Sequence, residues 1–273
     1  MADTLWTGSA DDKLYLTSGQ ITSTIKDSES IGAIDALPNG LEWDGTNTLW
    51  AGNQVTKKLY VTSGKFTSTL KVSTATAGFD NNLTDITEDG TNTGTVGTEA
   101  DKLYLLSGKI TTTFKTSAAI GTVSLYMQGM SWVSVNTLCT AKYNQDFGTD
   151  PKLYKLSGHF SSTIKLSLDI SPPEISPTGC SFDGTNTPFC GNADDKLYLS
   201  SGQFTSTLKD SEAVGTIDTN PTGVSTTNNA GRLGLGGGGA TLKSVDGVTL
   251  ANVKNVDGVA IADVKTVDGM TTS

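Results

Sequence analysis

The chain has 273 residues, enough for a large core; 36% of them are apolar, and Thr, Ser and Gly are abundant. Its formal charge is −9 without a basic cluster, which argues against nucleic acids and anionic membrane surfaces as partners. The first residues lack the segments of a secretory signal, no run approaches a membrane span of about 18 apolar residues, and three cysteines without metal spacing predict reduced thiols and synthesis in a cytosol.

A repeated stretch begins at Lys13 with Lys-Leu-Tyr-Leu-Thr-Ser-Gly and runs to residue 26. It returns with start-to-start steps of 45, 44, 50 and 44 residues. The later copies begin at Lys58, Lys102, Lys152 and Lys196. A fixed period in this range marks a repeat architecture, so the repeat unit has to be interpreted before any single residue.

The second copy shows the whole unit, which consists of four short segments at residues 40–44, 48–52, 58–62 and 66–71. Each segment predicts a strand, because polar and apolar residues alternate along it. In the fourth segment of the first copy, Ile21, Ser23 and Ile25 are expected to share one face. Ser18-Gly19 predicts a two-residue hairpin between the third and fourth strands, and Asp44-Gly45 predicts a turn between the first and second.

Four antiparallel strands per unit, repeated five times, predict an all-β fold that is a five-bladed β-propeller with four-stranded blades. The chain begins at a second strand, so the first blade lacks its innermost strand. Residues 221–227 match residues 38–43 and are expected to supply that strand and close the ring. The alternative architecture is a β-solenoid or a stacked array of hairpins.

The composition divides the chain into a propeller at 1–228, a Gly-rich linker at 229–241 and a tail at 242–273. The tail repeats every 11 residues, and the Asp-Gly in each unit favours strand–turn–strand over helix. So short a tail cannot bury its own apolar face, so it is interpreted as a docking or oligomerising segment; the alternative is a disordered tail. The apolar residues expected to dock are Val245, Val248, Leu250, Val256, Val259 and Ile261.

Candidate catalytic groups are few. The only histidine, His159, follows a Ser-Gly turn and is interpreted as an exposed loop residue, which excludes a His-based triad and a His-rich metal site. The inner strands carry acids that a propeller glycosidase would need, but those of the Asp-Gly turns have an ordinary turn-forming role. These acids are Glu42, Asp44, Glu88, Asp89 and Asp183. We therefore predict no enzyme, no cofactor and no metal.

Acids also precede the Lys-Leu-Tyr strands, where they are either calcium ligands or, as we favour, solvated turn residues. They are Asp11, Asp12, Asp101, Asp150, Asp194 and Asp195. The cysteines fall at apolar positions of the repeat and are predicted to be core thiols. Trp43, Trp50 and Trp132 fall on first and second strands, which predicts packing between blades.

Successive connections of an antiparallel blade alternate between the two faces of the ring. The first-to-second and third-to-fourth turns are short and uniform, whereas the other connections, such as residues 27–39, 53–57, 116–127 and 143–151, are longer and variable. Variable loops on a rigid ring are common recognition sites, although they are equally compatible with tolerated insertions. The candidate ligand-binding residues are Tyr126, Tyr143, Asp146 and Phe147.

The Trp-Asp-Gly-Thr-Asn-Thr-Leu-Trp-Ala-Gly block and the Lys-Leu-Tyr…Ser-Gly…Thr-Ser-Thr block resemble propeller repeats of tailed-bacteriophage proteins over residues 1–228. The Val-Asp-Gly-Val…Ala-Asn-Val tail is similar to short C-terminal repeats of phage virion proteins. In blade number and unit length the chain also resembles five-bladed tachylectin-type lectins, whose sugar-contacting residues do not map onto it.

The phage resemblance implies a structural and adhesive virion component, made in the host cytoplasm, of the tail-fibre, tail-tip or capsid-surface type. Its expected partners are other virion proteins, bound through residues 242–273, a host-surface glycan, and further copies of itself. The alternative is a free carbohydrate-binding lectin, and a third possibility is a propeller glycosidase. Finding the protein in purified virions would favour the first hypothesis.

Overall fold

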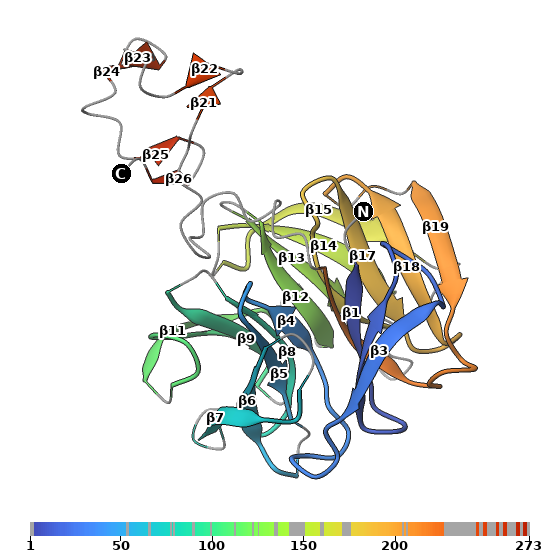
Figure 1. The fold of residues 1–273 in the computed structure, drawn as a ribbon. Helices are drawn as coiled ribbons and strands as arrows, with labels where there is room; N and C mark the ends of the chain where they lie inside the picture. The colour runs from blue at the N-terminus through green and yellow to red at the C-terminus, as the bar shows by residue number, and fades with distance from the viewer. Residues whose placement is uncertain are drawn as a thin grey trace.

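The computed structural model of the chain is an all-β propeller of five four-stranded antiparallel blades (Figure 1). It describes residues 3–226 apart from 53–54, 65–66, 77, 79, 89–90, 99, 112, 122, 125, 134–135, 142–150, 159–160, 171–175, 204 and 206, together with six short strands of the tail. No helix in these described residues has the length and apolarity needed to cross a bilayer.

The strands of each blade are given from the axis outward. Blade 1 contains β20 (Pro221–Thr226), β1 (Thr4–Gly8), β2 (Lys13–Thr17) and β3 (Ile25–Ser30). Blade 2 contains β4 (Leu41–Trp43), β5 (Asn47–Ala51), β6 (Lys58–Ser63) and β7 (Leu70–Ala75). Blade 3 contains β8 (Leu83–Glu88), β9 (Thr93–Gly97), β10 (Lys102–Leu106) and β11 (Phe114–Ala119). Blade 4 contains β12 (Met127–Val133), β13 (Asn136–Ala141), β14 (Lys152–Ser157) and β15 (Ile164–Asp169). Blade 5 contains β16 (Pro177–Cys180), β17 (Asn186–Gly191), β18 (Lys196–Ser201) and β19 (Leu208–Ala213).

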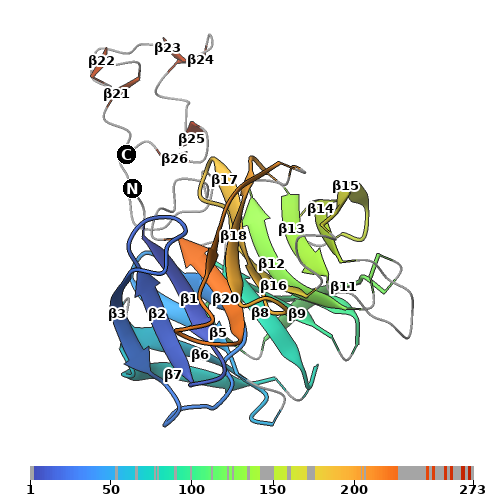
Figure 2. The same ribbon diagram turned by 90° about the vertical axis from the view of Figure 1, so that its right-hand side faces the viewer.

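The ring is closed by its two ends, as the sequence predicts. β20 pairs antiparallel with β1, with Thr4 opposite Thr226 and Trp6 opposite Val224. Figure 2 shows β20 in orange beside β1 in blue. Closure in this way gives blade 1 its innermost strand, so the inner edge of the blade is paired.

The core lies between blades. Each of five apolar clusters combines residues of two adjacent blades, for example Leu49 and Leu59 of blade 2 with Ile86 of blade 3. The predicted inter-blade packing of the tryptophans is confirmed: Trp43 and Trp50 belong to the cluster between blades 1 and 2, and Trp132 to that between blades 3 and 4. Burial of this apolar surface is the main stabilising term between blades.

The predicted two-residue hairpin between third and fourth strands is wrong. In blade 1 the Ser18 N–H donates to the Thr24 carbonyl at 2.9 Å and closes a longer loop, so β3 begins only at Ile25. The Thr22 hydroxyl donates to the Ser18 carbonyl at 2.7 Å, which shows that the Thr-Ser-Thr run caps a loop instead of extending a strand. Ile21 is buried beside the blade 5 cluster, whereas Ile25 is exposed. The loop glycine has a positive φ in all five blades.

The fourth strands also end later in the sequence than expected, so the connections that follow them are shorter. The first of them was expected at residues 27–39, but β3 continues to Ser30 and the connection covers residues 31–40. The third was expected at residues 116–127, and β11 continues to Ala119. The variable loops are therefore more compact than the sequence pattern suggests.

In each blade, a threonine of the second strand fixes the loop between the third and fourth strands. Its hydroxyl donates to the carbonyl of the loop glycine at 2.8–3.1 Å in all five blades. The pairs are Thr4–Gly19, Thr48–Gly64, Thr93–Gly108, Thr137–Gly158 and Thr187–Gly202. A side chain thus satisfies a loop carbonyl that has no strand partner.

The described strands of the tail form three short antiparallel pairs: β21 (Ser244–Val245) with β22 (Val248–Thr249), β23 (Asn255–Val256) with β24 (Val259–Ala260), and β25 (Thr266–Val267) with β26 (Met270–Thr271). An Asp-Gly pair lies between the two strands of each. The described residues of the 11-residue unit are thus strand and not helix, as predicted.

Candidate functional site

The two faces of the ring differ in the connections they carry. The turn face carries the first-to-second turns, such as residues 44–46, and the third-to-fourth loops around the positive-φ glycines. The loop face carries the second-to-third and fourth-to-first connections. The turn face also carries both ends of the ring. The Asp3 carboxylate accepts the Gly19 N–H at 3.3 Å. Near the end of β20, the Ser225 hydroxyl accepts the Trp43 N–H at 3.2 Å.

On the loop face, the described fourth-to-first turns between blades 1 and 2, blades 2 and 3, and blades 5 and 1 each end at an aspartate that rests on the next blade. Asp35 N–H donates to the Ile31 carbonyl at 3.0 Å, and its carboxylate accepts the Thr56 hydroxyl of blade 2. Burial raises the pKa of Tyr60, which also contacts Asp35, to about 12. Asp80 repeats this arrangement against Tyr104 of blade 3 at 3.2 Å. These acids fasten the loop face to the blades.

Three of the acids that precede the Lys-Leu-Tyr strands have backbone roles. Asp12, Asp101 and Asp195 adopt positive φ angles of 59°, 48° and 55° in the second-to-third turns. Their carbonyls accept the N–H of the residue that opens the fourth-to-first connection, at 2.8 Å in each case. Among the described residues, no group of three His, Cys, Asp or Glu side chains is arranged to hold a metal ion. The turn-residue interpretation therefore has a structural basis.

The predicted ligand-binding residues are placed only in part. Tyr126 is half-buried at the end of the blade 3–blade 4 connection, where its N–H donates to the Ser124 hydroxyl at 3.3 Å. Tyr143, Asp146 and Phe147 lie outside the described residues, as does His159. Binding by this group stays a prediction.

The central axis is lined by glycine. The inner strands of blades 2, 4, 5 and 1 place Gly40, Gly129, Gly179 and Gly223 at one level. A Cβ at these positions would lie 1.9, 2.1, 2.6 and 2.6 Å from the neighbouring inner strand, so only glycine fits. Blade 3 has Asp85 at this level instead, and its Oδ1 is the atom that a Gly40 Cβ would meet.

Asp85 links several blades across the axis. Its Oδ2 accepts the Met130 N–H of blade 4 at 2.8 Å, and its carboxylate also accepts the N–H of Cys180 in blade 5. Burial raises the pKa of Asp85 well above its ordinary value, and the nearby Glu42 charge raises it further, against the lowering effect of these N–H groups. A buried carboxyl thus serves as the acceptor for strand N–H groups at the centre of the ring.

Sequence reasoning missed Asp85. The signal is present, because aligning the inner strands of the five repeat units leaves one acid where four blades have glycine. An exception in a repeat points to a position whose role is unique to one blade. The acids considered instead, Asp44 and Asp183, accept the N–H groups of their own turns at 2.5–2.7 Å, which confirms their turn-forming role.

Further hydrogen bonds run around the axis from blade to blade. Thr84 Oγ1 donates to the Met127 carbonyl at 3.4 Å, and Thr178 Oγ1 to the Pro221 carbonyl at 3.0 Å. Thr222 Oγ1 donates to the Pro38 carbonyl at 2.7 Å and so crosses from the closing strand to blade 2. The inner strands, which share no β-ladder, are therefore joined by side chains.

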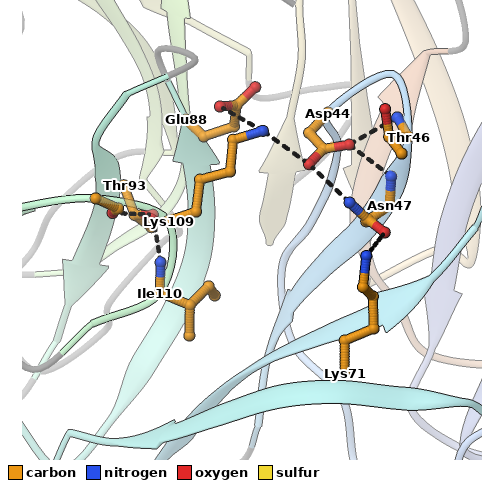
Figure 3. Close-up of polar contacts among 9 residues, drawn as sticks. Asp44, Thr46, Asn47, Lys71, Glu88, Thr93, Lys109 and Ile110 are labelled. Carbon is orange, nitrogen blue, oxygen red and sulfur yellow. Dashed lines mark hydrogen bonds and ion pairs between the residues drawn. The ribbon is translucent and has the colours of Figure 1, made fainter.

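The turn face carries a charged cluster between blades 2 and 3 (Figure 3). Lys109 Nζ lies 3.0 Å from Asp44 and 3.9 Å from Glu88, and the Asp44 side chain is fully buried. Burial raises the pKa of Asp44, but the Asn47 N–H and Lys109 outweigh it, so the pKa lies below its ordinary value. In blade 1, Gln20 occupies the place of Lys109 and donates to Asp183 of blade 5. The loop residue after each glycine thus reaches the turn of the preceding blade at these two junctions.

The three cysteines are buried and free, as predicted for core thiols. Burial raises the pKa of Cys139 and raises that of Cys180 well above its ordinary value. A thiol is nucleophilic only as its thiolate, so these groups are poorly suited to covalent catalysis. Of the predicted docking residues, Val245 lies opposite Val248 and Val256 opposite Val259 in the tail pairs, and Leu250 and Ile261 lie outside the described residues.

No family model matches the chain, and no curated protein sequence matches it. Among solved structures, a chain of a nidogen/laminin complex is similar, with a TM-score of 0.53 at 12% identity over 83% of this chain and 98% of that chain. Myxococcus xanthus glutaminyl cyclase gives a TM-score of 0.47 at 8% identity over 74% and 90% of the two chains. Virginiamycin B lyase from Staphylococcus aureus gives 0.44 at 13% identity over 80% and 72%. The likeness to the nidogen/laminin chain agrees with the blade architecture that the structure shows: the chain is a five-bladed β-propeller.

Proposed function

We propose that the chain is a non-enzymatic recognition protein of a virion, which presents the loop face of its propeller and is held through residues 242–273. The observation that carries the proposal is the position of the ring's two ends. Asp3 contacts Gly19 on the turn face, and β20 leaves the ring at Thr226 on the same face. An attachment through the tail therefore leaves the loop face, with its longer connections, free for a ligand.

The tail supports the attachment role. Each described pair of tail strands has only two residues per strand, for example Val245 opposite Val248. An isolated two-stranded hairpin is at best marginally stable in water, so such pairs gain stability by packing against something else. Other virion proteins, or the tails of further copies, are the partners proposed for this role.

The state of the inner acids supports a role without catalysis. Asp44, Asp183 and Asp85 each accept backbone N–H groups, and they are buried. Glu42 and Glu88, the other described acids of the inner strands, are also buried, each at 2% exposure. A glycosidase requires two carboxyls that a sugar can reach from opposite sides, so the burial of these described acids supports the non-enzymatic role.

The virion location and the phage origin rest on the sequence resemblance of the repeats and of the tail. The ligand proposed for the loop face is a glycan of the host surface, because aromatic rings and carboxylates, which these connections carry at a few positions, bind sugar rings and hydroxyls. Tyr126, Tyr143, Asp146 and Phe147 are the residues proposed to contact it.

Two full-length variants test the attachment. The first replaces Val245, Val248, Val256 and Val259 with serine, and the matched control replaces the exposed Ile25, Leu70, Ile164 and Leu208 of the propeller in the same way. Only the tail variant is expected to be lost from purified particles while still binding a glycan array. Glycan binding by a protein that never enters particles would favour the free lectin. Activity on a glycan that Glu42→Gln abolishes would favour a glycosidase.

A further inference from the structure

The junction between blades 5 and 1, where the ring closes, contains a carboxylate from the C-terminal side resting on the N-terminal hairpin. Asp218 accepts the N–H groups of Asn220 at 2.7 Å, Asp11 at 3.1 Å and Ala10 at 3.4 Å. Its approach depends on Gly8, because a Cβ there would lie 2.4 Å from Asp218 Oδ2. Asp218 therefore joins the chain just before β20 to the end of β1.

At two other junctions an aspartate packs against a strand glycine in the same way, but the residue that faces the aspartate differs. Asp35 rests on Gly52 and Asp80 on Gly97, and a Cβ at either glycine would lie 2.1 Å from the carboxylate. The difference lies two residues before each Lys-Leu-Tyr strand. Blade 2 has Thr56, whose hydroxyl donates to Asp35. Blade 3 has Ala100, whose N–H donates to Asp80 at 3.3 Å.

At the closing junction this position holds a second carboxylate, Asp11, whose N–H donates to Asp218 Oδ2 at 3.1 Å and whose carboxyl faces that of Asp218. Asp11 Oδ2 accepts the Tyr15 hydroxyl and lies 2.7 Å from Lys13 Nζ. Asp11 Oδ1 is buried and has no hydrogen-bond partner among the described residues other than what Asp218 can offer. Two facing carboxyls form a hydrogen bond only when they share a proton.

We propose that Asp11 and Asp218 form a proton-controlled clasp at the closure of the ring. One shared proton holds the two ends of the ring together in mildly acidic solution. Loss of the proton sets two carboxylates against each other and loosens β20 and the adjoining part of the loop face. The charged and titratable groups that face the pair are Lys13 and Tyr15.

The direction of the pH effect follows from the environment of the pair. Burial, and then the contact with Asp11, raise the pKa of Asp218 from 3.8 to about 6. A folded state with the higher pKa binds the extra proton, so the clasp contributes fully below about pH 4 and its contribution is lost as the pH rises through about 6. Asp11 has a pKa below its ordinary value, so one proton serves both carboxyls.

Hydrogen exchange of the full chain, corrected for intrinsic exchange, tests the clasp at pH 5 and pH 7.5. The amides of Ala10, Asp11 and Asn220 should be protected on the order of tenfold more strongly at pH 5. Asp11→Thr copies the blade 2 junction and should remove this pH dependence. The converse variant, Thr56→Asp, places a second carboxylate beside Asp35 and should create a pH dependence at the blade 1–blade 2 junction.

Equal protection at both pH values in the unmodified chain overturns the proposal. So does a pH dependence that persists unchanged in Asp11→Thr, since it would then come from other acids. If Asp11→Thr does not fold, Thr56→Asp decides, because it leaves the closing junction intact. Failure of Thr56→Asp to create a new pH dependence counts against the clasp, and success supports it.

Discussion

The Asp85 carboxylate accepts a 2.8 Å hydrogen bond from the N–H of Met130 in the neighbouring blade. Both residues belong to inner strands, which are joined around the axis by side chains. The other four blades have glycine at the level of Asp85, so this contact has no equivalent elsewhere in the ring. This acid therefore adds a contact between inner strands that the other blades do not provide.

Replacing Asp85 with alanine should lower the free energy of unfolding by about 2–4 kcal/mol, because the buried N–H groups of Met130 and Cys180 lose their acceptor. Chemical denaturation of the variant at pH 7 measures this loss. Asp27→Ala on the exposed outer strand β3 is the control and should change the value by less than about 0.5 kcal/mol. A loss as small as that of the control would show that Asp85 does not join the blades.

Because Asp35 packs directly against Gly52, substitutions at these two positions should have coupled effects on stability. In blade 4 the corresponding residues are Ser124 and Ala141, so a shorter connector side chain accompanies a larger strand residue. Gly52→Ala alone should cost about 2–4 kcal/mol of stability, because its Cβ would lie 2.1 Å from Asp35 Oδ2.

Adding Asp35→Ser to Gly52→Ala should recover part of that loss, since the clash disappears. A double-mutant cycle in chemical denaturation gives the coupling, expected at about 1–2 kcal/mol in the favourable direction. Strict additivity of the two substitutions would contradict the assigned contact.

Lys109→Met should destabilise the protein by about 1–3 kcal/mol at pH 7, because the buried Asp44 carboxylate loses its cation. The lowered pKa of Asp44 means that its ionised form stabilises the fold above about pH 4 and that this contribution is lost as the pH falls. The difference between the variant and the unmodified chain should therefore shrink in acid. Lys71→Met is the matched control in Figure 3, since Lys71 pairs at 3.0 Å with the neutral Asn47 on the surface. It should show a smaller loss without this pH dependence.

The three thiols should react with a thiol reagent only as the protein unfolds, because they are buried and burial raises the pKa of Cys139 and Cys180. The rate of modification at neutral pH can be followed by absorbance or mass. It should be much slower for the native protein than for the protein unfolded in concentrated denaturant. A cysteine introduced at the exposed Ser28 supplies the control and should react at once. Fast modification of native Cys180 would mean that the inner strands open.

Much of the fold is predictable because the same pattern of strand and turn residues recurs in several repeat units. The Asp-Gly turns, the Lys-Leu-Tyr strands and the match of residues 221–227 to the first strand of the unit all act locally, and each corresponds to an observed element. The fourth strand was misplaced for a physical reason. Alternation in Ile21, Ser23 and Ile25 is equally compatible with a loop in which hydroxyls cap carbonyls, and periodicity alone does not separate the two.

The centre of the ring was harder to predict. Asp85 draws its role from Met130 and Cys180, which come from other blades, so no local pattern shows it. The same is true of Asp11 and Asp218, which are more than two hundred residues apart in the sequence and meet only because the ring closes. Comparing equivalent positions across the copies, instead of searching each copy for motifs, would have found Asp85.

The closure of the ring by β20 has a mechanical consequence. Tension on the tail enters the propeller at Thr226 and acts along the length of β20, whose residues pair side by side with those of β1. The hydrogen bonds of that pair are therefore loaded together in shear, and they do not open one after another as they would if the strand were peeled sideways. A propeller held by its C-terminal end and pulled through its loop face thus carries the load on its closing strand, in the direction in which a β-ladder resists force best.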